Sequence, residues 1–127
     1  MPQPDEFKLV LSPDREAGWR ARHALRNRFA RSLPPQTLID LVAVVTELIN
    51  NAVKHGPGRP VTVGVVVGES TVRGEVSDQG NPAAAIPEIK KASAKAGGGL
   101  DLVDKLTSRW EVYEGSTHVW FEMPLKR

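Results

Sequence analysis

The stretch VVTELINNAVKHG, residues 44–56, places Glu47 and Asn51 four residues apart within a long apolar repeat. Apolar residues in and before this stretch recur at helical spacing, and Gly56 predicts where the helix ends. At about 100° per residue, Glu47 and Asn51 lie on one helical face, away from the apolar stripe. The stretch therefore predicts a core helix that presents a carboxylate and an amide one turn apart.

Asp78 belongs to a second motif, VSDQG at residues 76–80, which ends a valine-rich hairpin. Side chains alternate between the two faces of a strand, and Asp78 has the same parity as Val72 and Val76. If these valines face the helices, Asp78 points inward at the end of the sheet; alternatively, it caps a local turn with Gly80. A buried carboxylate needs hydrogen-bond donors, and the exocyclic amine of a purine is one such donor.

A third motif, GGGLDLV at residues 97–103, places three glycines before a short apolar helix. Glycine backbones can approach an anion closely, and a helix N-terminus favours phosphate. The three glycines could equally form a flexible hinge, and the motif is neither a Walker loop nor a Rossmann fingerprint. Thr117 shares its parity with Val119 and Phe121, so we expect its hydroxyl to enter the same pocket as Asp78.

Glu47 and Asn51 share their face roughly with Asp40 and Val44. An amide oxygen is a hard ligand suited to Mg²⁺, and a carboxylate one turn earlier can take the proton of a hydroxyl or water that attacks a phosphate. The simpler interpretation is a polar, solvated helix face. Spacing alone does not separate the two interpretations.

The remaining pattern predicts the fold class. In chain order we expect a strand at 7–11, a helix with Ser12 as N-cap, a helix from Pro35, a hairpin at 60–77, a long connection at 81–96, a helix from Leu100 and a hairpin at 109–123. This order predicts one domain over residues 1–127, an α/β sandwich (α+β) with a mixed, mainly antiparallel sheet and three helices on one face.

Bulk composition excludes several classes of protein. The 127 residues carry a formal net charge of +2, too balanced to indicate nucleic-acid binding, and contain no cysteine, which excludes disulfides and thiolate metal sites. No run of 18 apolar residues exists, so no membrane span is expected, and residues 1–6 lack the layout of a signal peptide. We expect a cytoplasmic protein.

The first predicted helix is strongly basic. Its arginines are Arg15, Arg20, Arg22, Arg26, Arg28 and Arg31. They form either a solvated face paired with acidic neighbours or a docking surface for an acidic partner protein. Direct nucleic-acid binding is less favoured, because Trp19 is the one aromatic residue on this basic face.

Taken together, the three motifs resemble those of the Bergerat-fold ATPases, the superfamily of gyrase, MutL and histidine-kinase catalytic domains. Residues 47–51 resemble the N box, residues 78–80 the Asp-x-Gly box and residues 97–100 the Gly-x-Gly-Leu box, while residues 81–96 match the ATP lid in position. The chain is most similar to the small stand-alone anti-sigma-factor serine kinases and their actinobacterial relatives, particularly over residues 108–124.

This resemblance implies a role for each matching position. Glu47 would be the general base, Asn51 the ligand of Mg²⁺ and Asp78 the residue that binds the adenine amino group of ATP. The turn at Asp78 would be shaped by Gly80. The other implied cofactor-binding positions, at the phosphates and at the adenine end, are Gly97, Gly99 and Thr117.

The resemblance predicts an ATP- and Mg²⁺-dependent serine/threonine-protein kinase whose partners are a sigma factor, an anti-anti-sigma-like protein, or both. Many relatives act as dimers, so a homodimer is compatible with it. The arginine common within the Gly-x-Gly unit is Gly98 here. This departure motivates a second hypothesis, a non-catalytic, nucleotide-responsive adaptor that binds protein. A third is an ATP hydrolase without a protein acceptor.

Overall fold

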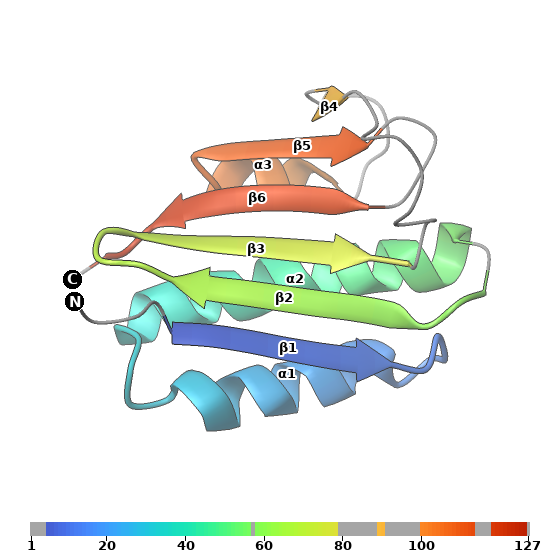
Figure 1. Cartoon of the computed structure of the whole chain (residues 1–127), viewed down its shortest axis with the longest axis horizontal. Helices are drawn as coiled ribbons and strands as arrows, with labels where there is room; N and C mark the ends of the chain where they lie inside the picture. The colour runs from blue at the N-terminus through green and yellow to red at the C-terminus, as the bar shows by residue number, and fades with distance from the viewer. Residues whose placement is uncertain (1–4, 57, 79–88, 91–99, 114–117, 127) are drawn as a thin grey trace.

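The computed structural model describes residues 5–56, 58–78, 89–90, 100–113 and 118–126 (Figure 1). Its strands form a single sheet in the order β1-β2-β3-β6-β5-β4. They are β1 (Asp5–Leu11), β2 (Val61–Val67), β3 (Thr71–Ser77), β4 (Ile89–Lys90), β5 (Arg109–Tyr113) and β6 (Val119–Pro124). Every pairing among these described strands is antiparallel.

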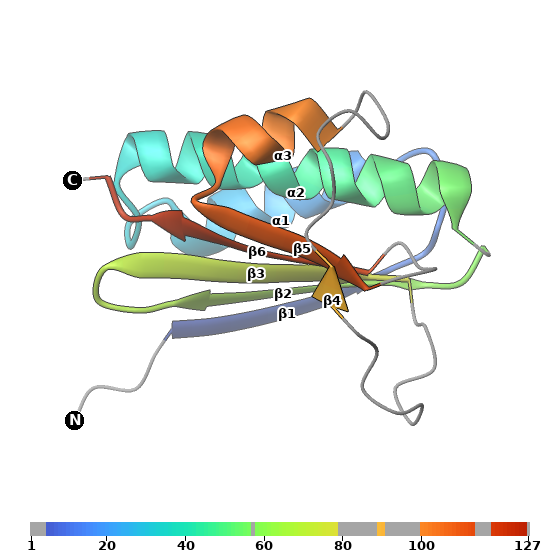
Figure 2. The same ribbon diagram turned by 90° about the horizontal axis from the view of Figure 1, so that it is seen from above.

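Three helices cover one face of this sheet, as Figure 2 shows. They are α1 (Ala17–Phe29), α2 (Pro35–His55) and α3 (Leu100–Leu106). The other face of the sheet carries no helix in the described part of the chain. The predicted α+β class, with three helices on one face of a mainly antiparallel sheet, is confirmed, but the described strands contain no parallel pair, so the sheet is not mixed there.

The start of α1 differs from the prediction. The helix begins at Ala17, four residues beyond the predicted first turn at Pro13, and Ser12 is not its N-cap. The reason is Asp14, whose carboxylate accepts a hydrogen bond from the backbone N–H of Glu16 at 2.9 Å. A short polar side chain that bonds nearby backbone in this way competes with helix formation. Residues 13–16 therefore form a turn that delays the helix.

The predicted lid at 81–96 contains a short strand that the sequence did not predict. In β4, Ile89 pairs with Tyr113 and Lys90 pairs with Val112. Two residues are too few to show the alternation by which a strand is predicted. The rest of the predicted lid lies outside the described residues.

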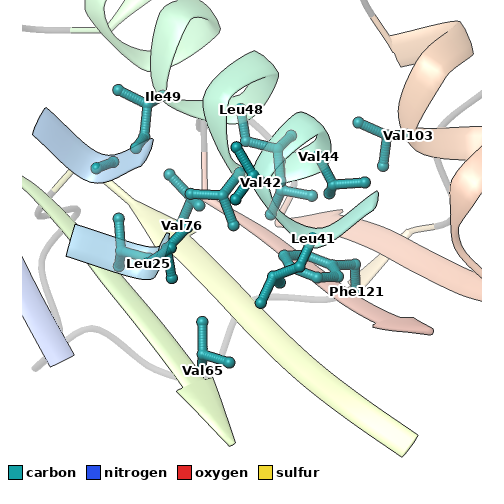
Figure 3. Packing of buried hydrophobic residues seen from close by; sticks show 14 of the residues in the cluster. Leu25, Leu41, Val42, Val44, Leu48, Ile49, Val65, Val76, Val103 and Phe121 are labelled. Carbon is teal, nitrogen blue, oxygen red and sulfur yellow. The ribbon is translucent and has the colours of Figure 1, made fainter. Parts of the chain in front are cut away.

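The core lies between α2 and the sheet. Figure 3 shows side chains of α2, among them Leu41 and Leu48, directed toward Val76 of β3 and Phe121 of β6. All four are buried, with at most 1% of their surface exposed. Because Leu41 and Leu48 are seven residues apart, they lie on the same stripe of the helix. The apolar stripe of α2 therefore packs against the inward-facing side chains of β3 and β6.

Gly74 makes room for the buried ring of Phe121. It pairs across the strands with Phe121, and a Cβ added to Gly74 would lie 2.1 Å from Cζ of the Phe121 ring. That separation is far inside van der Waals contact, so the ring occupies the space that any larger residue at position 74 would need. The absence of a side chain at Gly74 therefore lets the Phe121 ring pack closely against β3.

Among the described helices, α2 alone is long and apolar enough to cross a membrane, judged by length and composition. Nine of its 21 residues are buried, and it contacts α1, α3, β2 and β3. Burial in the core therefore accounts for its apolar composition. It is also the element that carries the first predicted site residues.

Candidate functional site

Glu47 and Asn51 lie in the C-terminal half of α2, and both side chains are partly buried. α3 runs antiparallel to α2 (Figure 2), so Leu100, its first residue, lies toward the half of α2 that carries these two residues. Residues 97–99, which the sequence predicts to approach phosphate, immediately precede Leu100.

Two residues predicted on the same face of α2 are covered rather than solvated. Val44 is fully buried on the side of α2 that faces Val103 of α3 (Figure 3). Asp40 is 4% exposed and accepts hydrogen bonds from Gln36 Nε2 at 2.9 Å and Lys126 Nζ at 3.0 Å. Because Asp40 and Val44 are covered, Glu47 and Asn51 form the more accessible part of this face.

Asp78 follows β3 directly and is 4% exposed. The inward direction predicted from strand parity is therefore confirmed, since Val72 and Val76 are also buried. The parity rule therefore holds for Asp78, one residue beyond the end of β3. The carboxylate consequently lies at the end of the sheet under the helical layer.

Gly56 brings the end of α2 against this carboxylate. A Cβ added to Gly56 would lie 3.1 Å from Asp78 Oδ2 and 2.3 Å from the carbonyl oxygen of Ala52. The Gly56 N–H donates to the same Ala52 oxygen at 2.8 Å, which closes the last turn of the helix. The sequence pattern identified Gly56 only as a helix stop; its contact with Asp78 depends on the fold and has no local signal.

The structure therefore brings Asp78 to the end of the helix that bears Glu47 and Asn51. The remaining predicted positions, Gly80, Gly97, Gly99 and Thr117, lie outside the described residues. Their roles stay predictions. Among the described residues, no group of three or more His, Cys, Asp or Glu side chains is placed to hold a metal ion. The predicted metal ligand is Asn51 alone.

These residues fit a purine nucleotide on chemical grounds. Asp78 offers a buried carboxylate as acceptor for an amine, and this carboxylate lies against the bare backbone of Gly56. Glu47 and Asn51 provide a proton acceptor and a hard oxygen ligand one helical turn apart. These are the groups that the sequence resemblance predicts for ATP with Mg²⁺: an acceptor for the adenine amine, a base and an oxygen ligand for the metal ion.

A separate hollow of about 370 Å³ lies on the sheet face without helices. Its lining comes from β1, β2, β3 and β6 and includes Lys8, Gly64, Glu75 and Trp120. None of Glu47, Asn51 and Asp78 contributes to it. This hollow is therefore distinct from the candidate nucleotide site, which lies on the helical side of the sheet.

A contact between Glu75 and His118 borders that hollow. His118 Nε2 lies 3.0 Å from Glu75 Oε1. Hydrogen bonding by His118, opposed by burial and aided by the charges of His118 and Lys8, lowers the pKa of Glu75 below its ordinary value of 4.5. The pair therefore favours the charged form of Glu75 on the open face of the sheet.

Comparison with known proteins agrees with this geometry. Residues 11–123 match the family model described as the histidine kinase-like ATPase domain. No curated protein matches the chain. Among solved structures, the crystal structure of the RsbU and RsbW domains of Rv1364c from Mycobacterium tuberculosis is similar, with a TM-score of 0.68 and 20% identity.

That similarity covers 96% of this chain and 32% of the other, so this chain spans about a third of the length of that neighbour. At this identity the likeness shows a shared fold. The family model, in contrast, matches most of the chain and includes all three motifs. The chain belongs to the histidine kinase-like ATPase domain family.

Proposed function

We propose that this protein is a cytoplasmic, ATP- and Mg²⁺-dependent kinase of the anti-sigma-factor type. It transfers the γ-phosphate of ATP to a serine or threonine of a partner protein and sequesters a transcriptional regulator. The observation that carries the proposal is the buried Asp78 carboxylate beside Gly56, at the end of the helix that bears Glu47 and Asn51. Membership of an ATPase domain family implies ATP binding.

Two further observations support the finer assignment. The motifs of the sequence resemble those of the stand-alone anti-sigma-factor serine kinases, and a similar solved structure contains an RsbW domain. On this basis the partners are a sigma factor, an anti-anti-sigma-like protein, or both. The partner and the phosphoacceptor are the parts of the proposal that require direct biochemical tests.

Each described site residue has one task in this proposal. The Asp78 carboxylate accepts a hydrogen bond from the adenine amine, and Asn51 supplies an oxygen ligand to Mg²⁺. Glu47 takes the proton from the attacking hydroxyl of the partner. When bound, ATP with Mg²⁺ supplies the transferable phosphoryl group and the charge that neutralises it. Gly80, Gly97, Gly99 and Thr117 complete the nucleotide site as the resemblance implies.

The kinase activity is tested by transfer of labelled phosphate. Extract of the source cells is first dephosphorylated with a phosphatase, and the phosphatase is then removed, so that the extract supplies protein acceptors. Wild-type protein is compared with Glu47→Gln, a variant whose side chain has the same size but lacks the basic carboxylate. We expect acid-stable phosphoserine or phosphothreonine with the wild type and a loss of roughly a hundredfold or more in the variant. Equal labelling by both proteins contradicts the assigned base.

The adaptor is the second candidate, and Gly98 is the observation that favours it. An adaptor needs nucleotide only as a conformational ligand, so it retains partner binding when catalysis is removed. If Glu47→Gln transfers no phosphate and neither does the wild type, while both bind Mg²⁺-ATP, the adaptor accounts for the protein better. Steady phosphate release without a protein acceptor would instead indicate a hydrolase.

A further inference from the structure

Trp19 is displayed on the outer face of α1. Its side chain is 55% exposed although it is the most costly type of side chain to leave in water. The indole contacts His23 one turn later, with ring centroids 4.2 Å apart and an interplanar angle of 53°. Trp19 is therefore held in place on the surface, where it contributes nothing to the core.

Two arginines flank this indole. At about 100° per residue, Arg22 and Arg26 lie within roughly 60° of Trp19 around the helix axis. In the described part of the chain neither arginine has an ion pair, whereas Arg20 is held by Asp14 and Arg28 by Asp5. The helix itself, AGWRARHALRNRF, contains no acidic residue. We call the four residues Trp19, Arg22, His23 and Arg26 the Trp19 surface.

A second tryptophan, Trp120, lies beside arginines on the open face of the sheet. There Arg73 and Arg109 lie over Trp120, at 4.9 Å and 5.1 Å from the ring centroid. Arg73 is also near Glu122, with Nε 3.8 Å from Oε2, so its charge is partly compensated. Trp120 is only partly exposed. Of these two tryptophan–arginine arrangements in the described residues, the one on α1 combines an exposed indole with arginines that have no described ion pair.

We infer that the Trp19 surface docks an acidic segment of the partner protein, with an apolar side chain of that segment seated on the indole. Charge complementarity selects an acidic occupant, because two uncompensated guanidinium groups favour carboxylates. Tryptophan and arginine are also the residue types that dominate binding energy at protein interfaces. One exposed tryptophan offers no series of stacking platforms, which disfavours single-stranded nucleic acid.

The position of this surface connects it to the candidate nucleotide site. Gly18, beside Trp19, packs closely on α2, where a Cβ added to it would lie 2.9 Å from Asn50 Oδ1. Asn50 precedes Asn51 in the chain. The start of α1 and the end of α2 lie at the same end of the molecule (Figure 1). A partner docked on α1 is thus close to α2, the proposed catalytic helix. This part of the inference rests on the proposed function.

Binding of a defined probe tests the inference. The probe is a fluorescein-labelled helical peptide of Glu, Leu and Ala, and its control carries Gln in place of every Glu. Fluorescence anisotropy is measured on the full chain without nucleotide. We expect the wild type to bind the Glu peptide roughly tenfold more tightly than the Gln peptide, with an affinity that falls as salt rises.

Matched variants assign this binding to one surface. Trp19→Ala and the double variant Arg22→Gln/Arg26→Gln are each expected to weaken binding about tenfold. Arg73→Gln/Arg109→Gln removes the same charge beside another tryptophan and is expected to leave binding unchanged. The inference is overturned if both double variants lose binding equally or if Trp19→Ala binds fully. It is also overturned if the wild type binds a duplex DNA oligonucleotide more tightly than the peptide, or does not bind the peptide.

Titration with Mg²⁺-ATP separates this result from failure of the proposed function. All variants are expected to bind nucleotide like the wild type, which also shows that they are folded. If nucleotide binds but the Trp19 surface does not select the acidic peptide, the inference fails and the proposed function stands. If the peptide discriminates as expected and nucleotide does not bind, the proposed function fails instead.

Discussion

The carboxylate of Asp78 lies against the backbone of Gly56, with Oδ2 3.1 Å from the position that a Cβ at residue 56 would take. This contact joins the end of β3 to the end of α2, two elements that the sequence separates by strand β2. The proposed adenine-binding residue is thereby placed at the end of the helix that carries the proposed base and metal ligand.

Gly56→Ala tests the importance of this contact. The added methyl group would meet the Ala52 carbonyl oxygen at 2.3 Å, so the last turn of α2 must shift. We expect a loss of about 1–3 kcal/mol in the free energy of unfolding, measured in urea, and weaker binding of Mg²⁺-ATP. Gly64→Ala is the control, because a Cβ there meets nothing within 4 Å. Equal behaviour of the two variants contradicts a special role for Gly56.

Gly74→Ala probes the packing of the sheet on α2. Its methyl group would fall 2.1 Å from Cζ of Phe121, so the ring must leave its place. We expect destabilisation of roughly 1–3 kcal/mol from overpacking. Phe121→Leu costs stability by itself, but the loss in the double variant should be smaller than the sum of the losses in the two single variants. Strict additivity in this double-mutant cycle would show that the ring is not what excludes a side chain at residue 74.

The contact between Glu75 and His118 predicts a pH-dependent contribution to stability. Because the hydrogen bond from His118 lowers the pKa of Glu75, folding favours ionised Glu75. The stabilisation is present above the ordinary value of 4.5 and is lost as the pH falls through the lower pKa of the folded state. Glu75 is half exposed, so we expect less than about 1 kcal/mol.

Glu75→Gln provides the measurement. At low salt, the difference in Tm between wild type and variant should shrink as the pH is lowered below 4.5, the ordinary pKa of the carboxyl group. Glu69→Gln, an exposed carboxylate in the β2–β3 turn, is the control for general charge effects. A difference that grows on acidification has the wrong sign and rules out the assigned linkage.

The buried carboxylate of Asp40 predicts a strong asymmetry between two variants. Lys126 Nζ and Gln36 Nε2 are its partners, at 3.0 Å and 2.9 Å. Lys126→Met leaves a buried charge with less compensation and should cost about 1–3 kcal/mol in urea unfolding. In a combined Asp40→Asn/Lys126→Met variant we expect part of this loss to be recovered. No recovery would place the effect in the backbone contacts of the C-terminal segment.

Local periodicity was enough to predict most of the architecture. The alternation of Val72 and Val76 correctly placed Asp78 inward, because a strand buried on one face leaves its register little freedom. The apolar stripe and terminal glycine of α2 likewise predicted its extent. These features depend on residues close together in sequence, which is why the pattern sufficed.

Features that depend on distant residues were not predicted. Asp40 and Val44 were placed on a polar face, yet α3 and the C-terminal segment cover them. The contact between Gly56 and Asp78 needs the hairpin to fold back on the helix. The late start of α1 has a local cause, Asp14, but its side-chain bond to the Glu16 N–H competes with the equally local cap expected at Ser12.

The central claim is that Asp78 binds the adenine amine of ATP, and calorimetric titration of Mg²⁺-ATP tests it most directly. Asp78→Asn keeps the size of the side chain but replaces an acceptor oxygen by a donor amide, so it opposes the amine. We predict saturable binding by the wild type and a loss of affinity of about tenfold or more in a folded Asp78→Asn variant. Equal affinity of the two proteins, or no binding by the wild type at millimolar ATP, would contradict the account.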